Sequence, residues 1–144
     1  MNKRRKLLSD LKKIAAHFRL SLSKIEIVKQ TAIALDIQNN KLIVMDESHH
    51  SYFKTIDLNK VGGCSLKVAY RSINAGELRE KHIDEFVENI QLQLLHIDPK
   101  MSVDIDFYVK KKNTVNELRE IILKARNWRD KITSLLPSNQ LIRA

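Results

Sequence analysis

The sequence lacks the residues on which several classes of protein depend. Its single cysteine, Cys64, can form no internal disulfide and gives no zinc-finger spacing. Its three glycines, at positions 62, 63 and 76, make no phosphate-binding loop. No run of about 18 apolar residues predicts a transmembrane helix, and the basic start lacks the uninterrupted apolar stretch of a signal peptide. These absences favour a reducing, cytoplasmic compartment, and nothing in the sequence indicates a metal or another cofactor.

The length and composition indicate a globular protein. A chain of 144 residues fits a single domain, here residues 1–144, and a hydrophobic fraction of 43% is far from the composition of disordered chains. The net charge of +9 is unevenly distributed. Residues 1–30 carry nine basic and two acidic side chains, residues 31–109 carry eight and twelve, and residues 110–131 carry eight and three. The basic ends around an acidic middle favour a contact between the termini and an anionic partner.

The first 20 residues predict a basic amphipathic helix. Apolar residues at 7, 8, 11, 14, 15 and 18 fall within one arc at about 100° per residue. The candidates for contact with an anionic surface are the basic residues Lys3, Arg4, Arg5, Lys6, Lys12 and Lys13. Either the apolar arc inserts into lipid, or it packs on the protein while the basic side faces the bilayer. The helix would also suit the cytoplasmic end of a preceding membrane span, and a merely solvated helix surface is the simplest alternative.

An antiparallel sheet of about six or seven strands is predicted over residues 25–110. Alternating apolar and polar residues predict strands over 25–37, 41–45, 52–58, 64–70, 88–97 and 103–109. Asparagines at 39 and 40 predict a hairpin turn, and Gly62 with Gly63 predicts another turn. In the last strand the alternation places Tyr108 on the solvent-facing side with the two aspartates, and Phe107 on the other side. Residues 72–86 read as an irregular insertion, either a loop or a short helix.

The C-terminal part predicts a long helix over residues 114–136. Thr114 and Glu117 match a capping box, apolar residues follow at helical spacing through Trp128, and Pro137 ends the pattern. Residues 137–144 are expected to form a loose tail. A run of strands followed by a segregated helix predicts an α+β fold, in which the last helix covers one side or the open end of a bent antiparallel sheet.

This pattern of elements resembles the pleckstrin-homology-like fold in its small bacterial form. The resemblance rests on the hairpin over 32–45, the segment 55–61, the strand 103–109 and the helix 114–136 with Trp128. It implies a strongly bent split barrel of about seven strands with a capping C-terminal helix, to which the N-terminal helix is an addition. It also implies binding of lipid headgroups or protein segments rather than catalysis. In that family phosphoinositide affinity depends on basic residues between the first two strands, and here residues 38–41 contain one lysine.

Other candidate chemistry is weak. Cys64 is expected on the apolar face of its strand, where a thiol packs as a small hydrophobe. The side chains of His49 and His50 diverge in extended backbone, so a shared metal is not expected. His96 could approach Asp104 or Asp106 across a turn, but two aspartates and one histidine make a poor metal site. No nucleophile with an oriented base is evident, so we expect no catalytic site and no metal site.

We therefore predict a non-catalytic interaction module, cytoplasmic and close to a membrane, that binds a protein or an anionic lipid surface. A secondary basic cluster is expected at Lys110, Lys111 and Lys112. Nucleic-acid binding by the basic terminal helices is the first alternative, although aromatic residues for base stacking are few near them. An enzyme with a site assembled from loops is the second alternative.

Overall fold

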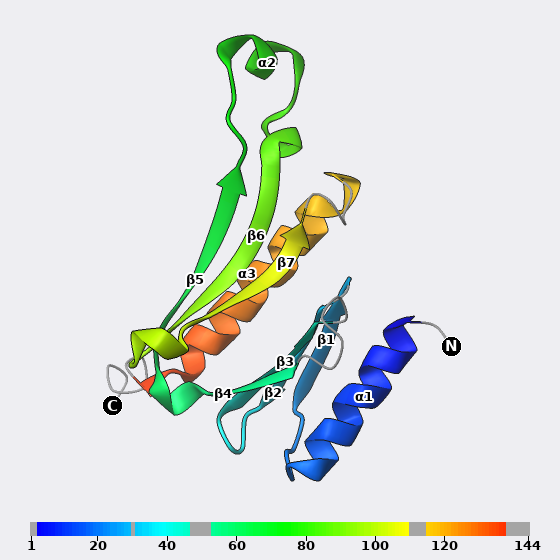
Figure 1. Ribbon diagram of the computed structural model, residues 1–144, viewed down its shortest axis with the longest axis vertical. Helices are drawn as coiled ribbons and strands as arrows, with labels where there is room; N and C mark the ends of the chain where they lie inside the picture. The colour runs from blue at the N-terminus through cyan, green and yellow to red at the C-terminus, as the bar shows by residue number, and fades with distance from the viewer. Residues whose placement is uncertain (1–2, 30, 47–52, 110–114, 138–144) are drawn as a thin grey trace. The chain divides into compact units, whose positions relative to one another are not determined.

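The computed structural model describes residues 3–29, 31–46, 53–109 and 115–137, and the elements within them are α-helices, 3-10 helices and strands (Figure 1). In chain order they are α1 (Lys3–His17), β1 (Lys24–Val28), β2 (Thr31–Asp36), β3 (Lys41–Asp46), β4 (Phe53–Asp57), η1 (Leu58–Lys60), β5 (Val61–Tyr70), α2 (Ala75–Glu80), η2 (Ile83–Phe86), β6 (Val87–His96), η3 (Pro99–Met101), β7 (Val103–Val109), η4 (Val115–Glu117) and α3 (Leu118–Leu135). The predicted α+β class is confirmed, with antiparallel sheets and a C-terminal helix.

The prediction of one bent sheet is wrong. The strands form a four-stranded sheet in the order β1-β2-β3-β4 and a three-stranded sheet in the order β5-β6-β7. The chain divides into two compact units, Met1–Gly62 with Ser134–Ala144, and Gly63–Thr133. The extended backbone of β4 ends at η1, where the Asp57 side chain accepts a hydrogen bond from the Asn59 N–H. This short helical turn separates the strands of the two sheets.

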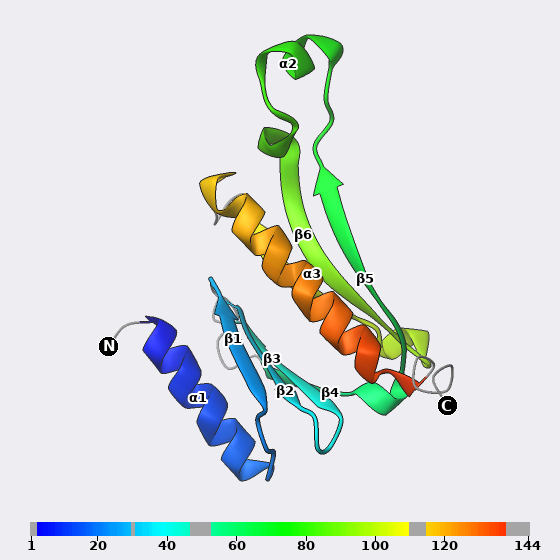
Figure 2. The same ribbon diagram turned by 180° about the vertical axis from the view of Figure 1, so that it is seen from behind.

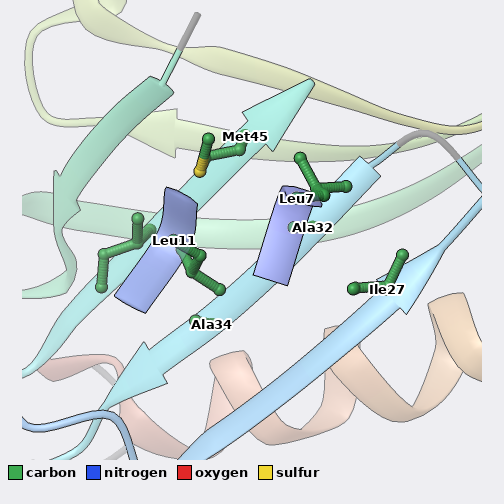
Figure 3. Packing of buried hydrophobic residues seen from close by; sticks show 7 residues of the cluster. Leu7, Leu11, Ile27, Ala32, Ala34 and Met45 are labelled. Atoms are coloured by element: carbon green, nitrogen blue, oxygen red, sulfur yellow. The ribbon is translucent and has the colours of Figure 1, made fainter. Parts of the chain in front are cut away.

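In the first unit, α1 packs its apolar side on the four-stranded sheet (Figure 3). Leu7, Leu11 and Ala15 follow one another at a spacing of four residues, and all three are buried. They belong to a cluster with sheet residues that include Ile27, Ala32, Ala34, Ile43 and Met45. The two alanines have short side chains, so the helix can approach the sheet closely. The sequence prediction of an amphipathic helix is confirmed, and its apolar arc packs on the protein.

The end of α1 is fixed by its backbone. Arg19 has a positive φ of 57°, and the Leu20 N–H donates to the Ala15 carbonyl at 2.8 Å. The Arg19 N–H donates to the Ala16 carbonyl at 3.2 Å, so the last turn has the hydrogen bonds of a Schellman motif. An arginine occupies the left-handed position where glycine is more usual, which stops the helix and turns the chain toward β1.

The segment predicted as one strand over 25–37 is two strands. Val28 of β1 pairs with Thr31 of β2, and Lys29 between them has a positive φ of 57°. Sequence patterns mark such turns by glycine or asparagine, and neither is present here, so the turn was missed. The next turn was predicted correctly: Asp36 pairs with Lys41, and Asn40 has a positive φ of 54°.

Asp36 is a buried carboxylate at the end of β2. It accepts hydrogen bonds from the Ser21 N–H at 3.0 Å, the Asn39 N–H at 2.9 Å and the Asn39 side-chain amide at 2.7 Å. Burial alone would raise the pKa of Asp36, but the Asn39 hydrogen bonds, together with those from Ser21 and Gln38, lower it below its ordinary value. The charged form therefore ties the connection before β1 to the turn after β2.

In the second unit, α3 lies along one face of the three-stranded sheet (Figures 1 and 2). Its buried residues Leu118, Ile121, Ala125, Trp128 and Ile132 keep the helical spacing that the sequence predicted. The predicted capping box at Thr114 lies outside the described residues, as does the tail from 138 onward. The three-stranded sheet opposes Leu92 and Leu94 of β6 to Ile105 and Val103 of β7, and all four are buried.

An irregularity in β7 changes the predicted alternation. Ile90 pairs with Tyr108 and Gln91 pairs with Asp106, so Phe107 has no opposite residue. Such a bulge shifts the following residue to the other face. Tyr108 is therefore fully buried, although the sequence predicts that it faces solvent. Its hydroxyl has no hydrogen-bond partner in the described part of the chain. Burial, and then the charge of Glu117, raise the pKa of Tyr108.

The predicted turn at the two glycines needs correction, and the alternatives for residues 72–86 are decided. Gly62 and Gly63 lie inside β5, and no described glycine has a positive φ, because η1 has already turned the chain.

The insertion at residues 72–86 is structured. Asn74 caps α2, and η2 follows before β6 begins. At its base the Arg71 side chain donates to the Glu77 carboxylate and lies 4.5 Å from the centre of the Phe86 ring. The alternative of a short helix is the one observed.

We expect Leu11→Ala to lower the free energy of unfolding by about 2–5 kcal/mol, because it leaves a cavity beneath α1. The matched control is Lys13→Ala, which truncates an exposed side chain on the same helix and should change stability by less than about 0.5 kcal/mol. Urea unfolding followed by circular dichroism measures both. Equal stabilities of the two variants would contradict the packing of α1 on the sheet.

We expect Asp36→Asn to lower the free energy of unfolding by about 1–3 kcal/mol at about pH 7, because an amide nitrogen would face the N–H donors. The pKa of Asp36 is lower in the folded than in the unfolded chain, so its stabilisation is complete above the unfolded value and disappears as the pH falls through the folded one. The difference between variant and wild type should therefore narrow on acidification below about pH 4. A difference that is constant between neutral and acidic urea titrations would exclude this role.

Candidate anionic contact surface

The outer side of α1 carries a group of exposed cations. Arg5, Lys6, Lys12 and Lys13 are exposed, whereas Leu7 and Leu11 between them are buried. The four lie along about 12 Å of helix, on the side opposite the sheet. No ion pair joins any of them to another residue of the described chain. We call these four residues the α1 basic face.

The side chains of two of the six predicted cations lie outside the described part of the structure. These are Lys3 and Arg4, in the first turn of α1. The structure therefore brings together Arg5, Lys6, Lys12 and Lys13 and leaves the side chains of the other two unplaced.

Of the apolar residues at positions 7, 8, 11, 14, 15 and 18 that could have inserted into lipid, Phe18 alone is exposed. Leu7 and Leu11 are buried, and Ile14 is half-buried against the same cluster. Phe18, just beyond the helix, is 51% exposed. Its ring lies 4.9 Å from that of His17 and 5.8 Å from that of Phe53. Contact with a surface through the basic face thus leaves the packing of α1 intact, whereas insertion of its apolar side would break it.

The secondary basic cluster at Lys110, Lys111 and Lys112 lies outside the described residues. The cations of α3 that follow it are partly compensated. Lys124 pairs with Glu120 at 3.2 Å, and Arg129 contacts Asp130 at 3.0 Å. Exposed pairs of this kind contribute little stability, but they reduce the local positive potential of the helix. The α1 basic face is the better candidate for an anionic contact.

The loop that the family resemblance singled out is not between the first two strands. The turn between β1 and β2 contains Lys29, and residues 37–40 form the next turn, between β2 and β3, with Lys41 as the first residue of β3. In that second turn Asn39 is engaged with Asp36, and the Asn40 side-chain amide donates to the Asn59 side-chain oxygen at 2.8 Å. These side chains hold the turn together.

The histidine and aspartate candidates have other partners. The Nδ1 atom of His96 accepts a hydrogen bond from the Asp98 N–H at 2.9 Å. One oxygen of Asp106 accepts from the side-chain amides of Asn89 at 3.1 Å and Gln91 at 2.8 Å. Within the described ranges, no three His, Cys, Asp or Glu side chains are grouped to hold a metal ion. His49 and His50 lie outside those ranges.

One surface was missed by the sequence reasoning. Near the end of β6, Leu95 is 60% exposed, and in the turn that joins β6 to β7, Ile97 is 72% exposed and Met101 is 52% exposed. The alternation ending at Leu94 accounts for the buried side of β6 but assigns no role to the apolar residues that follow. Their position on both sides of Asp98 and Pro99 is the signal that could have identified them, because turns of this kind usually carry polar residues.

Cys64 is half-buried, and burial is the largest influence on its pKa. It raises the pKa to about 12, with Arg129 lowering it and Asp130 raising it further. From the ordinary value of 9.0, this change reduces the thiolate fraction at neutral pH about a thousandfold.

We expect the native protein to react with a water-soluble disulfide reagent at least about a hundred times more slowly than the urea-unfolded chain at the same pH, because less of its Cys64 is thiolate. Similar rates in the two states would show that the thiol is accessible and reactive.

Similarity to known proteins assigns no role to these residues. Comparison with models of protein families, with curated proteins and with solved structures gives no match. Among the described helices, none has the length and apolarity needed to cross a membrane. A functional argument for this chain therefore depends on the chemistry of its own exposed side chains.

Proposed function

We propose that this protein is a non-catalytic interaction module that binds an anionic phospholipid surface through the α1 basic face. The observation that carries the proposal is the exposure of Arg5, Lys6, Lys12 and Lys13 on a helix whose opposite side is packed on the sheet. A basic residue close to an anionic membrane contributes about 1 kcal/mol of attraction. Four such residues on one short stretch are enough for reversible binding.

The proposed location is the cytoplasmic face of a membrane. Its support is the single free cysteine, which is unlike the disulfide framework of small secreted domains, together with the basic character of the N-terminal helix. A protein partner at the same membrane remains compatible with this function and would use other surfaces.

A pleckstrin-homology-like fold is also proposed. Its support is the order of elements, seven described strands followed by the C-terminal helix α3, which agrees with what the resemblance implies. The proposal concerns the fold alone, because the residues between the first two strands offer no cluster of cations for a phosphoinositide.

Binding is tested by sedimentation with vesicles of phosphatidylglycerol and phosphatidylcholine over a salt series. Lys12→Ala combined with Lys13→Ala should weaken binding by about 2 kcal/mol, roughly 30-fold, and reduce its salt dependence. The matched control is Lys60→Ala combined with Lys67→Ala, which removes the same charge from exposed positions outside α1. This control should bind nearly as the wild type does.

The same salt series with random single-stranded DNA tests the rival function. Phe18 offers an exposed ring near the end of the basic helix, which is the one observation that favours base stacking. Binding to DNA without binding to anionic vesicles would overturn the membrane proposal. Equal loss of vesicle binding in the two lysine pairs would also overturn it, because net charge and not the α1 basic face would then be responsible.

A further inference from the structure

The end of β6 and the turn that joins it to β7 carry large apolar side chains exposed to solvent. Ile97 is 72% exposed, Leu95 60% and Met101 52%, and all three lie within residues 95–101, which we call the hairpin tip. The tip joins the ends of the yellow-green β6 and the yellow β7 in Figure 1. Single exposed hydrophobic residues are ordinary, but several in one turn mark a surface that contacts an apolar partner.

Several backbone N–H groups of the hairpin tip donate hydrogen bonds within it. The Asp98 N–H donates to Nδ1 of His96 at 2.9 Å, and the Lys100 N–H donates to the Asp98 carboxylate at 3.1 Å. The Met101 N–H donates to the Asp98 carbonyl at 2.9 Å, and Pro99 has no N–H. A segment that enters a lipid layer must satisfy its backbone internally, because hydrocarbon offers no donors or acceptors. The N–H groups of Asp98, Lys100 and Met101 meet this requirement before any partner arrives.

The charges of the hairpin tip point to the same kind of partner. Asp98 and Lys100 are both exposed and of opposite sign, which suits the paired charges of zwitterionic headgroups. The apolar residues are aliphatic, whereas the dominant contacts of protein interfaces are enriched in tryptophan, tyrosine and arginine. We propose that the hairpin tip inserts Leu95, Ile97 and Met101 into the outer hydrocarbon region of a lipid layer. The proposal rests on the proposed function in that the partner is a membrane, but it uses a different surface and a different force.

The first test uses vesicles of phosphatidylcholine alone, which offer no net charge to the α1 basic face. Ile97→Ser combined with Met101→Ser should reduce sedimentation with these vesicles about tenfold, because the gain from apolar burial is lost. The matched control is Leu123→Ser, which should leave binding unchanged. Leu123 lies on α3 and is 59% exposed, similar to Ile97 and Met101. Circular dichroism and thermal melting check that each variant is folded.

The second test places a reporter in the hairpin tip. Ile97→Trp should show fluorescence that shifts to the blue and is quenched by vesicles of brominated phosphatidylcholine. Leu123→Trp is the control at an exposed position outside the tip, and its added fluorescence should not be quenched. The native Trp128 is buried and contributes the same signal to both variants.

The outcomes separate this proposal from the anionic contact of α1. Loss of the anionic component in the lysine variant, with normal phosphatidylcholine binding, leaves the tip proposal standing, and the converse leaves the α1 proposal standing. A wild type that does not sediment with phosphatidylcholine vesicles, or a bound Ile97→Trp protein that is not quenched, would overturn insertion of the tip. Self-association that disappears in the Ile97→Ser variant would overturn it in favour of an interface between copies of this chain.

Discussion

The packing of the apolar side of α1 on the four-stranded sheet is the interaction on which the proposed function depends. Leu7 and Leu11 close over Ala32 and Ala34, and this contact orients the whole helix. Because the apolar residues are engaged with the sheet, the cations on the other side point to solvent together. The same contact removes Leu7 and Leu11 from any role in lipid insertion, so the helix can attract a membrane electrostatically without leaving its own protein.

Two different forces are thereby assigned to two surfaces. The α1 basic face acts through charge, which salt weakens at ranges beyond the Debye length, about 10 Å at 0.1 M. The hairpin tip acts through burial of Ile97 and its neighbours, which salt affects little. Two aspartates hold turns in the chain: the Asp36 carboxylate binds the segment before β1 and the turn after β2, and the Asp98 carboxylate and carbonyl bind N–H groups of the hairpin tip.

The sequence predicted those elements whose local signals agree with the final structure. The amphipathic patterns of α1 and α3 and the turn at Asn40 are visible in the residues themselves. The errors arose where tertiary structure decides the backbone. Lys29 adopts a left-handed conformation that the preferences of lysine do not predict. The bulge at Phe107 moves the next residue, Tyr108, to the other face of the strand, where it is buried. The division into two sheets depends on which consecutive strands pair, since β4 and β5 do not, and a single alternating pattern does not encode that choice. Of the candidate surfaces, the basic helix follows from composition and period, whereas the hairpin tip is marked in the sequence only by apolar residues on both sides of Asp98 and Pro99, and their exposure comes from the structure.

Hydrogen exchange of the α1 amides, followed in the lipid-free protein and again with anionic vesicles, tests the central claim most directly. If α1 is part of the folded unit, the amides around Leu11 are protected in the free protein as strongly as those of β2, and vesicles add little further protection. Rapid exchange of α1 in the free protein, with protection appearing only on vesicles, would contradict the account, because the helix would then form by inserting its apolar side into lipid.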